Sequence, residues 1–162
     1  MSGAPTAEEV TLAVHGVLDP ELPAITIGEL GIVRAVRVPV DAAVEVHITP
    51  TYTGCPAVEV IIDAVIQAVR ATGRPDVEVR SVLSPAWTTD WISPEGRRKL
   101  SEAGIAPPGA AGNGPIEMML PPRCPRCRSA LTRELGFFGS TACKARYQCS
   151  ACHEAFEYVK PI

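Results

Sequence analysis

A strand followed by a helix stands out in the apolar pattern of the first half of the chain. In residues 44–48, Val-Glu-Val-His-Ile, every second side chain is apolar, which is typical of a strand with one buried face. Further on, apolar side chains recur at helical spacing, at Val58, Ile61, Ile62, Val65 and Val69. The pattern predicts an amphipathic helix that ends near Gly73, with a turn containing Cys55 between the strand and this helix.

Three further elements complete the predicted fold of this region. A capping box formed by Thr6 and Glu9 begins a helix whose apolar face, which includes Val17 and Leu18, ends at the prolines of residues 19–23. Residues 32–38 and 76–82 are predicted strands, and a strand–helix–strand crossover makes the last strand parallel to a neighbour. We therefore predict an α+β fold: a small two-layer domain with helices on one face of a mixed three-stranded sheet.

The remaining chain divides at a stretch rich in proline and glycine. Before this stretch, Ser93-Pro94-Glu95 supplies the N-cap, the first-turn proline and the early acid of a short helix. Residues 106–115 carry no charge and few side chains able to pack. The sequence predicts an α+β domain over residues 1–105, a linker over 106–116 and a small four-cysteine domain over 117–162.

Charge and hydropathy argue against several classes of protein. Residues 1–100 hold 13 acidic and 8 basic groups, and residues 101–162 hold 5 and 7, so neither half has the basic field of a nucleic-acid binder. No apolar run approaches the ~18 residues of a membrane span. The N-terminus lacks the basic start and apolar core of a secretion signal. We expect a cytoplasmic protein that contacts neither nucleic acid nor membrane.

Cys55 is the first candidate for chemistry. Gly54 permits a tight turn and Pro56 suits the first helical position, so Cys55 lies at or just outside a helix N-terminus. Unpaired N–H groups and the helix dipole favour a thiolate there, whereas a packed and inert thiol is the alternative. Asp19 and Glu21 are candidates for oxygen ligands near Cys55, or else form a polar turn that ends a helix.

Two C-x-x-C pairs near the C-terminus predict a metal site. Cys124 and Cys127 are separated by 21 residues from Cys149 and Cys152. Each pair can turn two sulfurs toward one ion, and the two pairs complete a tetrahedron. The surrounding ~45 residues cannot build a large core, so the metal must supply folding free energy. Zinc fits a closed structural site, and tetrahedral iron accepts the same ligands.

Cys143 and two tryptophans complete the candidate residues. Cys143 precedes Lys144, whose charge would lower the pKa of the thiol, unless Cys143 is simply packed inside the hairpin. Trp87 and Trp91 are the only tryptophans and lie four residues apart. They are candidates for docking a partner, because aromatic side chains are enriched in interfaces, or they cover a sheet edge.

Several motifs resemble known families. Three motifs of the first half resemble motifs of SufT-like proteins and of the eukaryotic cytosolic iron–sulfur targeting factors. They are Asp19-Pro20-Glu21-Leu22-Pro23, Leu30-Gly31-Ile32-Val33 and Thr51-Tyr52-Thr53-Gly54-Cys55-Pro56. Two further parts of the chain resemble the PaaD (PaaJ) family: the segment from Pro85 to Ser93 and the four-cysteine ribbon. Between its two C-x-x-C knuckles, the ribbon contains Phe138-Gly139-Ser140-Thr141-Ala142-Cys143-Lys144. Members of that family are accessory subunits encoded with the phenylacetyl-CoA 1,2-epoxidase.

The resemblance implies a role in phenylacetate catabolism. The epoxidase has a di-iron catalytic subunit and a reductase that carries flavin and an iron–sulfur cluster, and PaaD-like proteins help to load or mature one of these centres. By resemblance Cys55, with Asp19 and Glu21, handles iron or a cluster, and the four ribbon cysteines bind zinc. The chain itself is not expected to catalyse epoxidation.

Two other classes stay open at this point. One is a structural subunit that bridges the epoxidase complex and never touches iron. The other is an enzyme with Cys55 as nucleophile, although the sequence places no histidine to activate it. The sequence does not decide whether the chain forms a homodimer.

Overall fold

A computed structural model describes residues 5–109 and 120–162 of the 162-residue chain. It divides into two compact units, Met1–Trp87 and Thr88–Ile162. The short helix after Ser93, which the sequence assigns to the first domain, belongs to the second unit. Ala106 lies in a strand of that unit, and residues 110–116 of the predicted linker lie outside the described residues.

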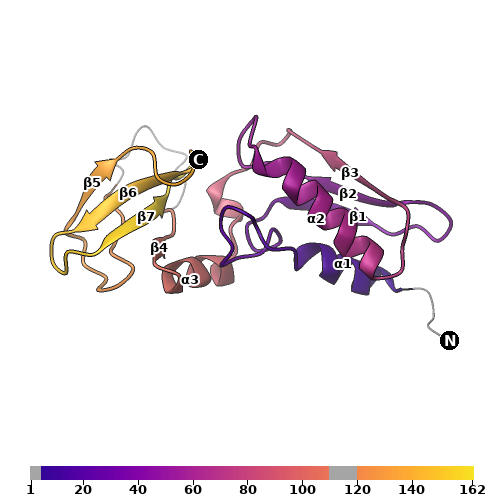
Figure 1. The fold of residues 1–162 in the computed structure, drawn as a ribbon, viewed down its shortest axis with the longest axis horizontal. Helices are drawn as coiled ribbons and strands as arrows, with labels where there is room; N and C mark the ends of the chain where they lie inside the picture. The colour runs from indigo at the N-terminus through magenta and orange to yellow at the C-terminus, as the bar shows by residue number, and fades with distance from the viewer. Residues whose placement is uncertain (1–4, 110–119) are drawn as a thin grey trace. The chain divides into compact units, whose positions relative to one another are not determined.

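The first unit confirms the predicted α+β fold. Its elements are α1 (Ala7–His15), β1 (Val33–Arg37), β2 (Val44–Ile48), α2 (Ala57–Ala71) and β3 (Val77–Ser81). The sheet has the order β1-β2-β3, with β1 antiparallel and β3 parallel to β2. Helix α1 packs against α2 and β1, and α2 packs against β3, so both helices cover the same face of the sheet (Figure 1).

Strand β2 forms the centre of this core. Val44, Val46 and Ile48 are fully buried, whereas Glu45 and His47, which alternate with them, are half-buried. The buried side chains of α1 and α2 are Val10, Val14, Ala57, Ile61, Val65 and Val69. Each fully buried aliphatic side chain contributes about 1.5–3 kcal/mol relative to exposure, so the apolar face of each helix fixes its place on the sheet.

Helix α1 begins as predicted and ends earlier than predicted. The capping box is present: Glu9 N donates to Thr6 Oγ1 (3.2 Å) and Thr6 N donates to Glu9 Oε2 (2.7 Å). The helix stops at Gly16, so the prediction that Val17 and Leu18 extend its apolar face is wrong. The Val17 carbonyl instead accepts a hydrogen bond from Ile27 N (2.8 Å) and Leu18 pairs with Thr26, because this segment forms a small hairpin.

The second unit is a four-stranded sheet with a helix. A 3₁₀ turn, η1 (Thr89–Trp91), and α3 (Pro94–Glu102) precede strands β4 (Ile105–Ala106), β5 (Thr132–Gly136), β6 (Lys144–Cys149) and β7 (Ala155–Val159). The strand order is β4-β7-β6-β5, in which only the β4–β7 pair is parallel. Within the described residues, no helix combines the length and apolar composition needed to cross a bilayer.

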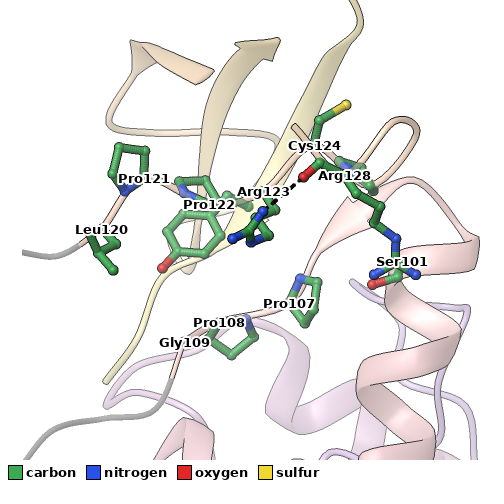
Figure 2. A pocket seen from close by; sticks show the side chains of 12 residues that line it. Ser101, Pro107, Pro108, Gly109, Leu120, Pro121, Pro122, Arg123, Cys124 and Arg128 are labelled. Atoms are coloured by element: carbon green, nitrogen blue, oxygen red, sulfur yellow. Dashed lines mark hydrogen bonds between the residues drawn. The ribbon is translucent and has the colours of Figure 1, made fainter. Parts of the chain in front are cut away.

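This unit contains a cavity of about 310 Å³ beside the first cysteine pair (Figure 2). Proline rings, Tyr158, Ser101 and two arginines line it, and Arg123 donates a hydrogen bond to the carbonyl of Arg128 (3.2 Å). The described lining residues include no histidine, aspartate or glutamate. The cavity therefore offers no carboxylate or imidazole from these residues.

Candidate metal centre and the Cys55 loop

The four ribbon cysteines converge on one point. Their Sγ atoms all lie within 4.8 Å of one another, with 3.7 Å between Cys124 and Cys152 and 3.6 Å between Cys127 and Cys149. A tetrahedral zinc ion with Zn–S bonds of about 2.3 Å requires S–S separations of about 3.8 Å. The four thiols therefore fit zinc. Over residues 5–109 and 120–162, no other group of three or more potential ligands converges in this way.

The two C-x-x-C turns have the same backbone structure. Arg128 N donates to the Cys124 carbonyl (2.9 Å), and His153 N donates to the Cys149 carbonyl (3.0 Å). Arg128 and His153, each directly after the second cysteine of its pair, have positive φ angles of 64° and 62°. His153 thus closes the second turn through its backbone, and the four sulfurs supply the ligand set.

The electrostatics of the thiols also favour a bound cation. The N–H groups of Cys152 and Ala151 outweigh burial and lower the pKa of Cys149 to about 6. The Glu154 N–H lowers the pKa of Cys152. Burial and the neighbouring sulfurs raise it by a larger amount, so the pKa of Cys152 lies above its ordinary value, at about 12. Four thiolates at these distances repel one another, so their common deprotonation requires the positive charge of a metal ion.

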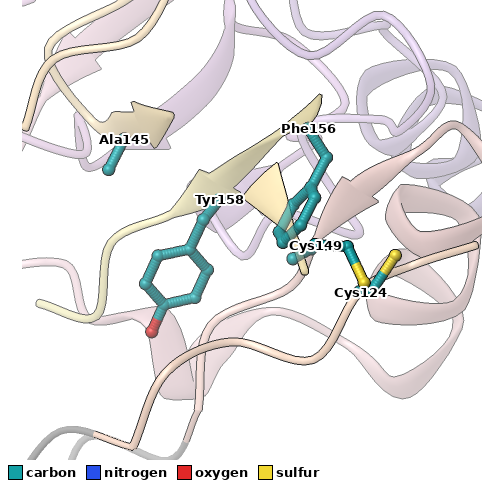
Figure 3. Close-up of a cluster of buried hydrophobic side chains, with 6 residues drawn as sticks. Cys124, Ala145, Cys149, Phe156 and Tyr158 are labelled. Carbon is teal, nitrogen blue, oxygen red and sulfur yellow. The ribbon is translucent and has the colours of Figure 1, made fainter. Parts of the chain in front are cut away.

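The metal ligands are also part of the core of the second unit. Cys124 and Cys149 are fully buried and cluster with Ala106, Ala145, Phe156 and Tyr158 (Figure 3). Tyr147 packs against this cluster and lies edge-on to Tyr158, with 5.5 Å between the ring centroids. Because two of the six buried residues of this cluster are ligands, binding of the ion and packing of the cluster depend on each other.

Cys55 lies where the sequence predicts, directly before the N-terminus of α2. Pro56 is the N-cap residue, Val58 N donates to the Cys55 carbonyl (3.2 Å), and Gly54 has the positive φ of 81° that a tight turn requires. The residue keeps only 9% of its surface exposed. This burial fits the alternative of a packed thiol stated for Cys55.

The two carboxylates do not form a ready-made site with Cys55. Asp19 is buried, and its Oδ1 accepts hydrogen bonds from Glu21 N (2.9 Å) and Leu22 N (2.7 Å). Asp19 thus holds the turn of its own motif, which is the structural alternative stated for it. Among the described residues, Asp19, Glu21 and Cys55 do not converge as a group of metal ligands.

Thr49 is a residue of this region that the sequence does not single out. It directly follows β2, at the start of the connection to Cys55, and is 1% exposed. Within the described residues its hydroxyl is the one buried side-chain polar atom without a hydrogen-bond partner. A buried unsatisfied hydroxyl costs about 1–3 kcal/mol. Only the packing of the folded chain reveals such a group.

Comparison with known proteins decides the family. Residues 116–160 match the PaaD zinc beta ribbon domain, and residues 7–82 match the iron-sulfur cluster assembly protein family. A protein of Escherichia coli K12, named as a proposed subunit of 1,2-phenylacetyl-CoA epoxidase, is 46% identical over 160 residues, which cover 98% of this chain and 94% of that protein. The chain belongs to the PaaD family.

The first unit of this PaaD chain also occurs in shorter proteins. An Fe-S protein maturation auxiliary factor of Porphyromonas gingivalis is 32% identical over 96 residues, 59% of this chain and 90% of that protein. The crystal structure of a domain of unknown function from Bacillus anthracis matches with a TM-score of 0.54 and 25% identity, over 58% of this chain and 90% of that one. A PaaD chain therefore joins an iron–sulfur assembly domain to a zinc ribbon.

The tryptophan segment of the PaaD chain is structural at Trp87. This side chain is 5% exposed, and its Nε1 donates to the Leu30 carbonyl (3.0 Å), so the prediction that it docks a partner is wrong. Trp91 is half-buried in η1, in the second unit. The two tryptophans therefore lie in different units.

The segment between the knuckles also buries its candidate thiol. Cys143 is 9% exposed, and its Sγ lies 3.1 Å from Thr141 Oγ1. The Lys144 ammonium group, expected to act on Cys143, lies 3.0 Å from Glu157 Oε2. Cys143 therefore fits the alternative of a packed thiol in the hairpin.

Proposed function

We propose that this PaaD-family chain is an accessory subunit that loads or matures an iron or iron–sulfur centre of the phenylacetyl-CoA epoxidase. Its partner is the catalytic di-iron subunit, the reductase or both, and Cys55 binds the transferred iron or cluster transiently. The observation that carries the proposal is the joining of two matches in one chain. The first unit matches iron–sulfur assembly proteins, and the E. coli relative over nearly the full length is named as an epoxidase subunit.

The Cys55 loop supports transient binding. A cysteine sulfur is a soft ligand that suits iron, and Thr53, Gly54 and Pro56 around Cys55 are exposed. Binding then requires a local opening of the β2–α2 connection, which would also give the Thr49 hydroxyl a partner. The zinc ion of the ribbon has a structural role and takes no part in the transfer.

A second function has observations in its favour. Cys55 is mostly buried, and Asp19 is occupied by its own turn, as expected of a bridging subunit that binds the epoxidase and never touches iron. Both functions predict stable association with the epoxidase. They differ in whether removing the Cys55 sulfur lowers the metal content of the epoxidase.

The test compares two serine variants. Cys55 and Cys143 are both 9% exposed, so Cys55→Ser and Cys143→Ser remove equally buried thiols. The epoxidase subunits are purified without oxygen from cells that express each variant, and their iron and acid-labile sulfide contents are measured. We expect metal-poor epoxidase with Cys55→Ser and fully loaded epoxidase with Cys143→Ser. Fully loaded, active epoxidase from Cys55→Ser cells would reject the maturation role in favour of a bridging subunit.

A further inference from the structure

Two adjacent phenylalanines are exposed on the second unit. Phe137 and Phe138 follow β5 and keep 61% and 65% of their surface exposed. Their rings meet edge to face, with 5.1 Å between centroids. Single exposed apolar side chains are ordinary, but two aromatic rings in contact form a concentrated apolar surface of the kind that anchors protein interfaces.

Lys160 holds this aromatic pair in place. Its Nζ lies 4.0 Å from the centroid of Phe137 and 4.8 Å from that of Phe138. The same ammonium group donates a hydrogen bond to the Phe137 carbonyl (3.2 Å). Cation–π contacts to both rings reduce their freedom before any partner arrives, so less conformational entropy is lost on binding.

The turn that follows the pair is built around one carboxylate. Glu157 accepts hydrogen bonds from Ser140 N (2.6 Å) and Ser140 Oγ (3.0 Å) and pairs with the buried Lys144 (3.0 Å). A Cβ atom on Gly139 would lie 2.8 Å from Glu157 Oε1 and 3.3 Å from the Lys144 backbone carbon, so a larger residue here would have to displace its neighbours. Lys144 is buried in this pair and Glu157 is half-buried, and together with the Ser140 hydrogen bonds the pair fixes the backbone that presents the two rings.

The charges around the rings indicate the nature of the partner. Lys160 contacts both rings, and the exposed Arg146 lies opposite Gly136 in the β5–β6 register. Glu157 is already engaged by Ser140 and Lys144. A two-fold contact with a second copy would bring Lys160 against Lys160, so charge disfavours self-association through this surface.

We propose that Phe137, Phe138 and Lys160 form the surface that docks the chain onto an apolar pocket with an acidic rim on another epoxidase subunit. The choice of the epoxidase as partner rests on the proposed function. The surface itself rests on the exposure of the rings, their contacts with Lys160 and the fixed turn behind them. Docking through the second unit leaves the Cys55 loop, in the first unit, outside this contact surface.

The experiment titrates the zinc-loaded full chain against each purified epoxidase subunit. We expect the double variant Phe137→Ala/Phe138→Ala to bind its subunit at least about 30-fold more weakly, as for loss of an interface hot spot. Leu131→Ala is the matched control, because Leu131 is 68% exposed in the same unit, and its binding should be unchanged. Arg146→Glu should weaken binding about tenfold at low salt, and the effect should fade at high salt.

Three outcomes would overturn the docking surface: no binding of the wild type to any subunit, unchanged binding of the double variant, or self-association of the chain that the double variant abolishes. Circular dichroism and zinc content check that each variant is folded. The Cys55→Ser variant should bind the epoxidase subunit normally, which separates this inference from the proposed function. Unchanged binding by the double variant together with metal-poor epoxidase from Cys55→Ser cells would remove only the docking surface.

Discussion

Arg128 and His153 occupy equivalent left-handed positions in the two zinc knuckles, with φ angles of 64° and 62°. Non-glycine residues pay about 1–2 kcal/mol for this conformation, partly offset by the entropy that glycine would lose on folding. His153→Gly should therefore raise the free energy of unfolding of the zinc-loaded chain by roughly 0.5–1 kcal/mol. Denaturant titration measures this, and His153→Ala, which keeps the strain, should show no gain. Loss of zinc from His153→Gly would contradict the backbone role assigned to His153.

Zinc removal should unfold the second unit and leave the first one folded. Cys124 and Cys149 belong to the core of the second unit, whereas the core of the first unit surrounds β2 and contains no ribbon ligand. Hydrogen exchange of the intact chain, with and without a chelator, measures this by segment. We expect β5, β6 and β7 to lose protection and β1, β2 and β3 to keep it. Protection of the ribbon strands in metal-free protein would contradict the account.

A local sequence pattern predicts a helix or strand well where a single rule, such as alternation or capping, determines the bounds of that element. Strand β2 coincides with residues 44–48 because alternate side chains face the core, and Thr6 with Glu9 gives the start of α1. The end of α1 does not follow from the pattern, since the apolar spacing continues to Leu18 while the backbone there pairs with residues 25–27. The competing hydrogen bonds come from a segment that helical periodicity does not take into account.

Tertiary contacts explain what the sequence does not predict about the units and the site. The division after Trp87 depends on contacts between distant residues: Thr88 Oγ1 and Thr89 N bind the Ile162 carbonyl (2.7 and 3.1 Å), and β4 pairs with β7. Spacing alone gives the four zinc ligands, because a C-x-x-C turn is a local structure. The burial of Cys55 and Trp87 depends on what folds over them, so no local pattern predicts it.

Asp19 variants separate the structural role of this residue from ligand chemistry. Asp19→Asn keeps an acceptor for Glu21 N and Leu22 N and should remain close to wild type in stability. Asp19→Ala leaves these N–H groups without their acceptor and should cost about 1–3 kcal/mol. Denaturant unfolding measures the stability, and the iron content of co-expressed epoxidase measures delivery. Normal stability with lost delivery in Asp19→Asn would show that the carboxylate acts as a ligand and not only as a turn residue.

Glu157 should make the stability of the second unit depend on pH. Burial raises the pKa of Glu157, but hydrogen bonds from Ser140 and the charge of Lys144 outweigh it and lower the pKa below its ordinary value of 4.5. A lowered folded-state pKa adds stability above the unfolded value, and this stability is lost as pH falls through the folded value. The stability difference between wild type and Glu157→Gln should therefore shrink in acid. A difference that is constant from neutral pH into acid would contradict this ion-pair role.

The most direct test of the central claim follows isotopically labelled iron from this chain to the epoxidase. The anaerobically purified chain is loaded with labelled iron, with and without sulfide, and mixed with each metal-free epoxidase subunit, and the label in the reisolated subunit is counted. The account predicts that the wild type and Cys143→Ser transfer labelled iron to the subunit. With Cys55→Ser, the subunit should take up label no faster than it does from free iron. Equal transfer by Cys55→Ser and the wild type would contradict it.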